Sequence, residues 1–211
     1  WGSAKPFSVG WWAVVSDDYQ AENNNGQTIT LPRGCMVRYR EWYGCQPNKP
    51  DTGLKLHAEE VARGILKREK KGEVSYGVFD PAAFAEDGGP SIASRIRREG
   101  VNFKPADNAR VAGRGAMGGW DQMRARLTGD ADGRPMIACF STCHDSIRTI
   151  PALIHDSSKA EDLDTTMEDH AADEWRYACM SRPWVRQIDV KKTKALPDYK
   201  GNQREETSWR V

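Results

Sequence analysis

The chain has 211 residues, a length that fits one sizeable domain with at most a tail beside it. Its 31 basic and 30 acidic side chains nearly cancel, so bulk charge does not indicate a polyanionic partner, and any surface for nucleic acid must be local. The sequence has no signal-peptide pattern and no apolar run long enough to cross a membrane, so no membrane partner is expected.

Five cysteines are scattered along the chain without the spacing of a disulfide framework, which favours reduced thiols in a cytoplasmic setting. Cys139, Cys143 and His144 lie close enough in sequence to suggest part of a zinc site. Because a matching second pair of ligands is missing, we expect buried free thiols there instead.

The first part of the chain changes from a strand pattern to a helix pattern. The apolar residues 7 to 15 predict a buried strand. The turn sequence of residues 23 to 26 leads into a second strand, which we expect to pair with a third at residues 35 to 44 in a meander. Residues 51 to 72 then predict a helix, whose apolar stripe consists of Leu56, Val61, Ile65 and Leu66.

Residues 73 to 80 predict a fourth strand, which ends at Asp80 because Pro81 cannot continue a ladder. Ser91 is expected to cap a short basic helix, and an exposed loop should follow it. The later patterns predict a helix, a fifth strand, a short helical piece and a last helix, over residues 119 to 127, 135 to 142, 146 to 154 and 165 to 184.

These elements in this order predict an α/β fold in which helices pack on a mixed central β-sheet. After Pro183 the sequence becomes polar and basic, so we expect a domain over residues 1 to 185 and a flexible basic tail over residues 186 to 211. The glycine-rich residues 113 to 119 lack the Gly-Lys-Ser/Thr ending of a phosphate-binding loop, which argues against a nucleotide site of that type.

The last helix gathers ionisable residues on the side opposite its apolar stripe. Asp169 and Asp173 are one turn apart, and His170 can reach the same point. Thr165 and Glu168 match a capping box, which gives Glu168 a structural role at the helix start. Asp173 lies in the middle of the helix, where a second carboxylate repels it unless a cation is present. The pattern alone slightly favours a solvated face over a metal site.

Asp80 adds a second acidic position, at the end of the predicted fourth strand. By itself, an Asp before a Pro is usually a turn residue. Together with an acidic helix beside the sheet, Asp80 matches a two-metal nuclease, in which carboxylates hold two Mg²⁺ or Mn²⁺ ions about 3.5–4 Å apart.

Cutting a duplex requires phosphate contacts, mainly from Lys and Arg. For any single basic residue, an ordinary surface charge is the simpler interpretation. A group of basic residues after Asp80 nevertheless predicts a DNA-facing surface beside the acidic site: Arg95, Arg97, Arg98, Lys104, Arg110, Arg114, Arg124 and Arg126.

Five stretches of the sequence read "WGSAKPFSVGWWAVV", "VRYREWYG", "YGVFDPAAF", "GRGAMGGWDQMRARL" and "EDHAADEWRYA". Together they resemble the nuclease domain of the large terminase subunit of tailed bacteriophages, and the resemblance covers roughly residues 1 to 185. It implies a ribonuclease H/resolvase-like fold. It also implies a metal-dependent endonuclease that cuts concatemeric double-stranded viral DNA at the start and end of packaging.

The resemblance further implies roles for the acidic residues. Asp80 and Asp173 would be catalytic and would hold two divalent cations, Mg²⁺ or Mn²⁺. His170 would act beside them as a further catalytic residue, and Asp169 would be an additional metal ligand.

One feature departs from the family pattern. The first catalytic acid of the family sits in a strand directly before a Trp-Gly pair, and here Trp1 and Gly2 open the chain, which looks like part of a longer protein. That acid is therefore either upstream of Trp1 or absent. Asp17 and Asp18 follow the far end of the strand and are expected turn residues.

The resemblance implies double-stranded DNA as the substrate and, in the full-length protein, an N-terminal ATPase domain, a small terminase subunit and a portal as partners. It places the protein in the host bacterial cytoplasm, and we expect the isolated domain to be a monomer. Two alternatives stay open: a resolvase-like nuclease for branched DNA, and, if the first acid is absent, a non-catalytic module that docks DNA or the portal.

Overall fold

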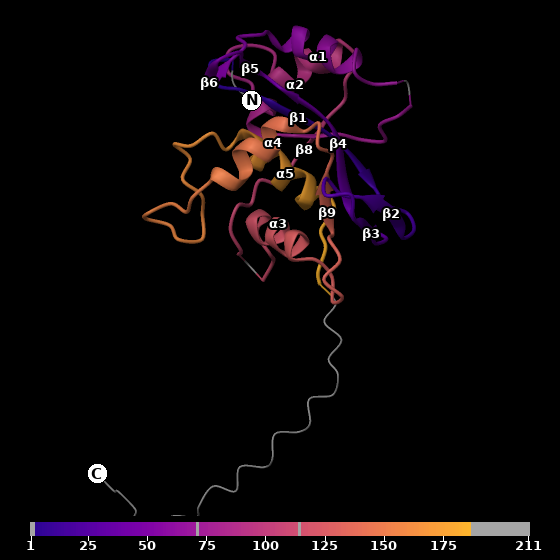
Figure 1. The fold of residues 1–211 in the computed structure, drawn as a ribbon. Coiled ribbons are helices and arrows are strands. Elements are labelled where there is room, and N and C mark those ends of the chain that lie inside the picture. The colour runs from indigo at the N-terminus through magenta and orange to yellow at the C-terminus, as the bar shows by residue number, and fades with distance from the viewer. Residues whose placement is uncertain (1–2, 71, 114, 187–211) are drawn as a thin grey trace, which may run out of the picture.

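The computed structural model describes residues 3–70, 72–113 and 115–186. In this part of the chain a small β-sheet lies between two groups of helices (Figure 1). The predicted tail falls almost wholly outside the described residues, and Arg114 lies outside them as well. None of the described helices is long and apolar enough to cross a membrane.

The central sheet has the strand order β1-β4-β9. Strand β1 (Ser8–Val14) pairs antiparallel with β4 (Met36–Tyr43), and β4 pairs in parallel with β9 (Ile137–Cys139). A mixed sheet with helices on its faces is therefore present, and the predicted α/β class is confirmed.

The predicted three-stranded meander is wrong. Strand β3 (Thr28–Leu31) pairs with β2 (Tyr19–Glu22) and not with β4, because β1 already occupies that side of β4. Backbone hydrogen bonds between Val15 and both Gly34 and Cys35 carry the β1–β4 pairing toward the smaller hairpin. The four strands thus form one long, interrupted hairpin, whose outer part projects from the body of the protein (Figure 1).

Helices α1 (Ala58–Leu66) and α2 (Ile92–Arg98) cover one face of the sheet (Figure 1). As predicted, Ser91 caps α2 by accepting a hydrogen bond from the Ser94 amide at 3.1 Å. Helix α1 is shorter than predicted, and an unpredicted hairpin precedes it, made of β5 (Cys45–Gln46) and β6 (Lys49–Gly53). The core on this face comprises Phe7, Trp11, Ala58, Val61, Ala62, Ile65, Ile96 and Val101.

Helices α3 (Gly119–Thr128), α4 (His144–Thr149) and α5 (His170–Ser181) lie on the other side of the sheet (Figure 1). A short 3₁₀ turn, η2 (Ile150–Ala152), continues α4. The core on this side comprises Met36, Trp120, Met123, Ile137, Ala172, Trp175, Ala178 and Cys179. Adjacent residues of β1 point to opposite faces, so Trp11 packs under α1 and Trp12 packs against Trp175 of α5.

The predicted fourth strand is much shorter than expected. Only β7 (Val78–Phe79) is a strand, and it pairs in parallel with β8 (Lys104–Pro105) in a separate two-stranded sheet. Val74 and Tyr76, which were expected inside a strand, are 41% and 39% exposed and line a pocket. After β7 the chain turns at Asp80 into the 3₁₀ helix η1 (Pro81–Phe84).

Candidate functional site

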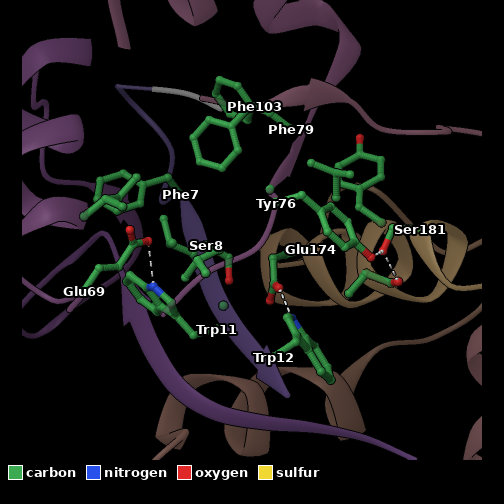
Figure 2. Close-up of a pocket in the computed structure, with 18 of the residues that line it drawn as sticks. Phe7, Ser8, Trp11, Trp12, Glu69, Tyr76, Phe79, Phe103, Glu174 and Ser181 are labelled. Carbon is green, nitrogen blue, oxygen red and sulfur yellow. Dashed lines mark hydrogen bonds between the residues drawn. The ribbon is translucent and has the colours of Figure 1, made fainter. Parts of the chain in front are cut away.

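Asp80, His170 and Asp173 line one pocket of about 890 Å³. They come from two segments that are distant in the sequence, since Asp80 follows β7 and the other two lie in the first turn of α5. Figure 2 shows this pocket, with Trp11 and Trp12 of β1, Tyr76, Phe79, Phe103 and Glu174 among the side chains around it. The structure therefore brings the two predicted acidic positions to the same cavity.

A hydrogen bond from the backbone fixes the Asp80 side chain. Its Oδ1 accepts a hydrogen bond from the Ala82 amide at 2.9 Å, which caps η1, and Pro81 occupies the first turn of that helix, where no amide hydrogen is needed. The turn role expected for an Asp before Pro is thus present, and it orients the carboxylate at the wall of the pocket.

Helix α5 begins later than the sequence predicted. Its first residue is His170, and the expected Thr165–Glu168 capping box is wrong. Glu168 instead accepts hydrogen bonds from the Arg148 guanidinium at 2.8 and 2.9 Å and from the Tyr43 hydroxyl at 2.9 Å. A bidentate contact with a guanidinium is stronger than a contact with a backbone amide, which explains why the capping pattern did not form.

Asp173 is held by two arginines. The Arg176 Nη2 and Nε atoms donate to its Oδ1 at 2.9 and 3.1 Å, and the Arg110 Nη1 atom lies 3.5 Å from the same oxygen. Arg176 is almost fully buried, and it passes close to Gly119, where a Cβ would collide with the Arg176 side chain. Arg176 and Arg110 therefore fix the orientation of Asp173 from the interior side of the pocket wall.

Asp169 lies behind the wall, with only 7% of its surface exposed. Burial, and then the negative charge of Asp173, raise the pKa of Asp169 above its usual range. The His170 Nδ1 atom is 3.6 Å from Asp169 Oδ1, and the His170 Nε2 atom is 3.3 Å from Asp51 Oδ1. Asp51 belongs to the unpredicted β6 strand, so its contact with His170 had no signal in the sequence.

Two acidic residues of the pocket affect the pKa of Tyr177. Burial raises the pKa of this phenol, and the negative charges of Asp173 and, to a lesser degree, Asp80 raise it further. Both carboxylates therefore act on one side chain across the pocket.

Beneath the pocket lies a buried charge cluster that was not predicted from the sequence. Arg38 is fully buried on β4 and forms ion pairs with Glu41 and with Glu174, whose Oε2 is 2.7 Å from Arg38 Nη2. Glu174 Oε1 also accepts a hydrogen bond from the Trp12 indole at 2.6 Å. Glycine is required at Gly10, since a Cβ there would collide with Glu174 and Arg38. The sequence signal for this cluster was the presence of the charged residues Arg38 and Glu41 inside a strand that is otherwise largely apolar.

The carboxylates at the pocket are the type of ligand that a hard divalent cation prefers, but they are fewer than a complete metal site needs. Mg²⁺ takes oxygen ligands, and it is commonly held by one or two carboxylates together with water and substrate phosphate. Asp80 and Asp173 provide such carboxylates at one pocket. Within residues 3–70, 72–113 and 115–186, no group of three or more His, Cys, Asp or Glu side chains is placed to hold a metal ion.

The basic residues predicted to face DNA occupy different environments. Arg97, Arg98, Lys104 and Arg124 are exposed. Lys104 lies opposite Val78 in the β7–β8 pair, which places it on the strand next to the one that leads to Asp80. Arg95 is partly exposed and forms a bidentate contact with Glu59 at 2.8 Å.

Two other basic candidates are engaged inside the protein. Arg110 donates to Asp162 at 2.8 Å and lies beside Asp173, so it belongs to the support of the acidic site. Arg126 is only 3% exposed and donates to backbone carbonyl groups of Gly34, Met136 and Arg182, so the structure does not present it to a phosphate. The sequence does not distinguish an arginine that is buried against backbone carbonyl groups from one that is exposed.

The structure is similar to that of the large terminase from a thermophilic bacteriophage. One structure of that protein matches with a TM-score of 0.56 and 18% identity, covering 86% of this chain and 38% of that one. Its complex with ADP matches with a TM-score of 0.53 and 20% identity, covering 84% and 36%. The chain therefore has a terminase-like fold and spans little more than a third of the length of that protein. No protein-family model and no curated protein matches the sequence.

Proposed function

We propose that this chain is the nuclease domain of a large terminase, a metal-dependent endonuclease that cuts concatemeric double-stranded DNA during viral genome packaging. The observation that carries the proposal is that Asp80, at the end of β7, and Asp173, in the first turn of α5, line the same pocket. The similarity of the fold to a bacteriophage large terminase supports the biological setting.

In this proposal Asp80 and Asp173 are the ligands of Mg²⁺ or Mn²⁺. The bound ions would activate water and stabilise the leaving oxygen of a phosphodiester. Arg176 and Arg110 keep Asp173 in one orientation by contacting its Oδ1. His170 lies at the rim between Asp51 and Asp169 and is positioned to exchange a proton with a group in the pocket. Asp169 is buried and does not line the pocket, so in this proposal it supports His170 from behind the wall and is not one of the metal ligands.

The DNA would approach the acidic pocket from the side of β8. Arg97, Arg98, Lys104 and Arg124 are the exposed members of the predicted surface within the described residues, and they would contact phosphates without reading sequence. In a full-length terminase the partners would be an ATPase domain, a small subunit and a portal, and the site of action would be the host cytoplasm.

Plasmid cleavage in the presence of Mn²⁺ or Mg²⁺ tests the proposal. Asp80→Asn and Asp173→Asn each keep an oxygen that can accept the observed hydrogen bonds, so both variants should fold and neither should cut. Asp132→Asn is the matched control, because the Asp132 side chain is 75% exposed and lies outside the pocket. Unchanged cleavage by either site variant would reject the assignment.

A second candidate function is a non-catalytic module that binds DNA or the portal. It is favoured by the finding that the described residues contain no group of three metal-ligating side chains. The two functions differ in one outcome, since the module would bind duplex DNA without any metal-dependent cutting. Four-way junction DNA in the same assay would separate a resolvase-like activity from a packaging nuclease.

A further inference from the structure

The arginines that hold the candidate metal ligand Asp173 approach only one of its two carboxylate oxygens. Arg176 donates to Oδ1 from Nη2 and Nε at 2.9 and 3.1 Å, and the nearest atom of Arg110, Nη1, lies 3.5 Å from the same oxygen. Within the described part of the chain, no hydrogen bond is donated to Oδ2. Because Asp173 lines the pocket, Oδ2 is the oxygen that it can offer to a cation there.

Arg110 is shared between two carboxylates. Its Nε atom donates to Asp162 Oδ1 at 2.8 Å, whereas its Nη1 atom comes no closer than 3.5 Å to Asp173. The third nitrogen, Nη2, is buried and has no hydrogen-bond partner among the described residues. Arginine binds a carboxylate most strongly through two parallel hydrogen bonds, which occupy both oxygens. In the observed orientation Arg110 does not form such a pair with Asp173, although it has a donor left to do so.

Asp162 is the stronger partner of Arg110. Its Oδ1 atom accepts hydrogen bonds from Arg110 and from the Trp120 indole, each at 2.8 Å, and from the Leu163 amide at 2.9 Å. Burial acts to raise the pKa of Asp162, but these hydrogen bonds outweigh it and lower the pKa below its usual range. Asp162 is therefore ionised at neutral pH, and a full negative charge faces Arg110 on the side away from Asp173.

Asp162 lies outside the pocket, in the loop between η2 and α5. Its amide donates to the Lys159 carbonyl group at 2.8 Å, and its own carbonyl group accepts a hydrogen bond from the Asp156 amide at 2.9 Å. These bonds fold the loop on itself and fix the backbone of Asp162. Because Asp162 does not reach the pocket, any effect of its side chain on Asp173 passes through Arg110.

Trp120 brings the two arginines together. The guanidinium carbon atoms of Arg110 and Arg176 lie 5.1 and 5.2 Å from the centroid of its ring, and the Trp120 amide donates to the Arg110 carbonyl group at 3.0 Å. Two positive charges beside one ring repel each other unless each has a negative partner. Asp173 is that partner for Arg176, and Asp162 is that partner for Arg110.

We propose that Asp162 is a positioning residue that holds Arg110 aside from Asp173 and so keeps Asp173 Oδ2 open to a divalent cation. The inference rests on the proposed nuclease, because the cation belongs to that function. Once the charge of Asp162 is removed, Arg110 gains by turning its unpartnered Nη2 atom toward Asp173. The resulting ion pair competes with the cation for the carboxylate, so loss of the Asp162 charge weakens cation binding without altering any ligand.

Binding of Mn²⁺ to the chain of residues 1–211, followed by electron paramagnetic resonance, tests this role. Asp162→Asn keeps an oxygen that accepts the hydrogen bonds from Trp120 and Leu163 but removes the charge. We expect it to weaken Mn²⁺ binding by about tenfold, the size typical for loss of a residue that orients a metal ligand. Glu161→Gln is the matched control, because it removes the same charge from the neighbouring, exposed position and should leave the Mn²⁺ affinity nearly unchanged.

A second substitution separates positioning from a general loss of structure. Arg110→Gln, added to Asp162→Asn, removes the competing cation and should recover most of the lost Mn²⁺ affinity. Lys159→Gln, added to Asp162→Asn instead, removes an exposed positive charge from the same loop and should recover none. The inference is overturned if Asp162→Asn binds Mn²⁺ as the unaltered chain does, or if adding Arg110→Gln leaves the affinity as low as in Asp162→Asn alone.

A measurement without metal keeps this inference apart from the proposed nuclease. The NMR signal of the Arg110 Nε–H group reports the position of the guanidinium. Asp173→Asn should shift this signal more in the Asp162→Asn chain than in the unaltered chain, because Arg110 turns to Asp173 only when Asp162 has lost its charge. Equal shifts in both chains would contradict the role of Asp162. Unequal shifts in a chain that does not bind Mn²⁺ would instead refute the nuclease and confirm that Asp162 restrains Arg110.

Discussion

Two nitrogen atoms of Arg176 donate to a single oxygen of Asp173, with Nη2 at 2.9 Å and Nε at 3.1 Å from Oδ1. The remaining Arg176 nitrogen, Nη1, donates to the carbonyl group of Asn108 at 2.9 Å. The arginine is 2% exposed, so it cannot move to solvent while the helix is intact. Arg176 is therefore a positioning residue for the candidate metal ligand.

Replacing Arg176 with Met should destabilise the protein. It leaves Asp173 and the Asn108 carbonyl without their main partner, and loss of one member of a buried pair costs about 3 kcal/mol. Arg124→Met is the control, because Arg124 pairs with Asp121 on the surface and should change stability by less than about 1 kcal/mol. Urea unfolding measures both values, and similar losses for the two variants would contradict the assigned role of Arg176.

Arg38→Met should lower the free energy of unfolding by more than Arg176→Met does, by about 3–5 kcal/mol. The reason is that it leaves the carboxylates of Glu41 and Glu174 buried without their cation. Arg40 offers a matched comparison two residues along β4, because its pair with Glu73 is partly exposed. Arg40→Met should lower the free energy of unfolding by only the small amount that is typical of surface pairs. If the two variants unfold at the same urea concentration, the buried cluster does not stabilise the fold as proposed.

Much of the fold could be predicted from periodicity and turn residues. The apolar run before Val15 and the Ser91 cap gave the right elements, because these features act locally. The pairing of β3 could not be predicted, since it depends on β1 occupying the edge of β4. Strand β7 is also shorter than expected, because Val74 and Tyr76 line the pocket and are not part of a strand.

At the candidate site, the residue types were predictable but their partners were not. Asp80 and Asp173 were chosen for their positions at a strand end and in a helix, and both line the pocket. Asp51 and Arg38 reach the site from strands β6 and β4, through contacts between residues far apart in the sequence. A sequence shows which side chains are charged, whereas the fold decides which charges meet.

Stability should fall at alkaline pH because of Cys179. Burial raises the pKa of this thiol from 9.0 to about 12. As the pH rises through 9, the unfolded chain loses the proton first, so the stabilisation present below pH 9 is lost progressively up to about pH 12. Cys179→Ala should therefore show a shallower decline of unfolding free energy between pH 9 and 11, by roughly 1 kcal/mol per pH unit. Cys45→Ala, in a partly exposed position, is the control and should keep the steeper slope.

Lys104 should contribute to DNA binding through a phosphate. It is exposed on β8, next to the strand that leads to Asp80. Lys104→Gln should lower the slope of log affinity against log salt by about 0.9, the value for one phosphate contact. Fluorescence anisotropy with a DNA duplex at several KCl concentrations measures this slope. Lys159→Gln, outside the predicted surface, should leave it unchanged, and an equal effect of both substitutions would argue against a local DNA surface.

Binding of Mn²⁺, followed by electron paramagnetic resonance, tests most directly whether Asp80 and Asp173 share a metal site. We expect Asp80→Asn and Asp173→Asn each to weaken Mn²⁺ binding by about tenfold or more, and the double variant to lose less than the sum of the two effects, because both remove ligands of one site. Asp132→Asn should bind Mn²⁺ as the unaltered chain does. Unchanged Mn²⁺ affinity in either single variant, or independent losses that add fully in the double variant, would contradict a shared site.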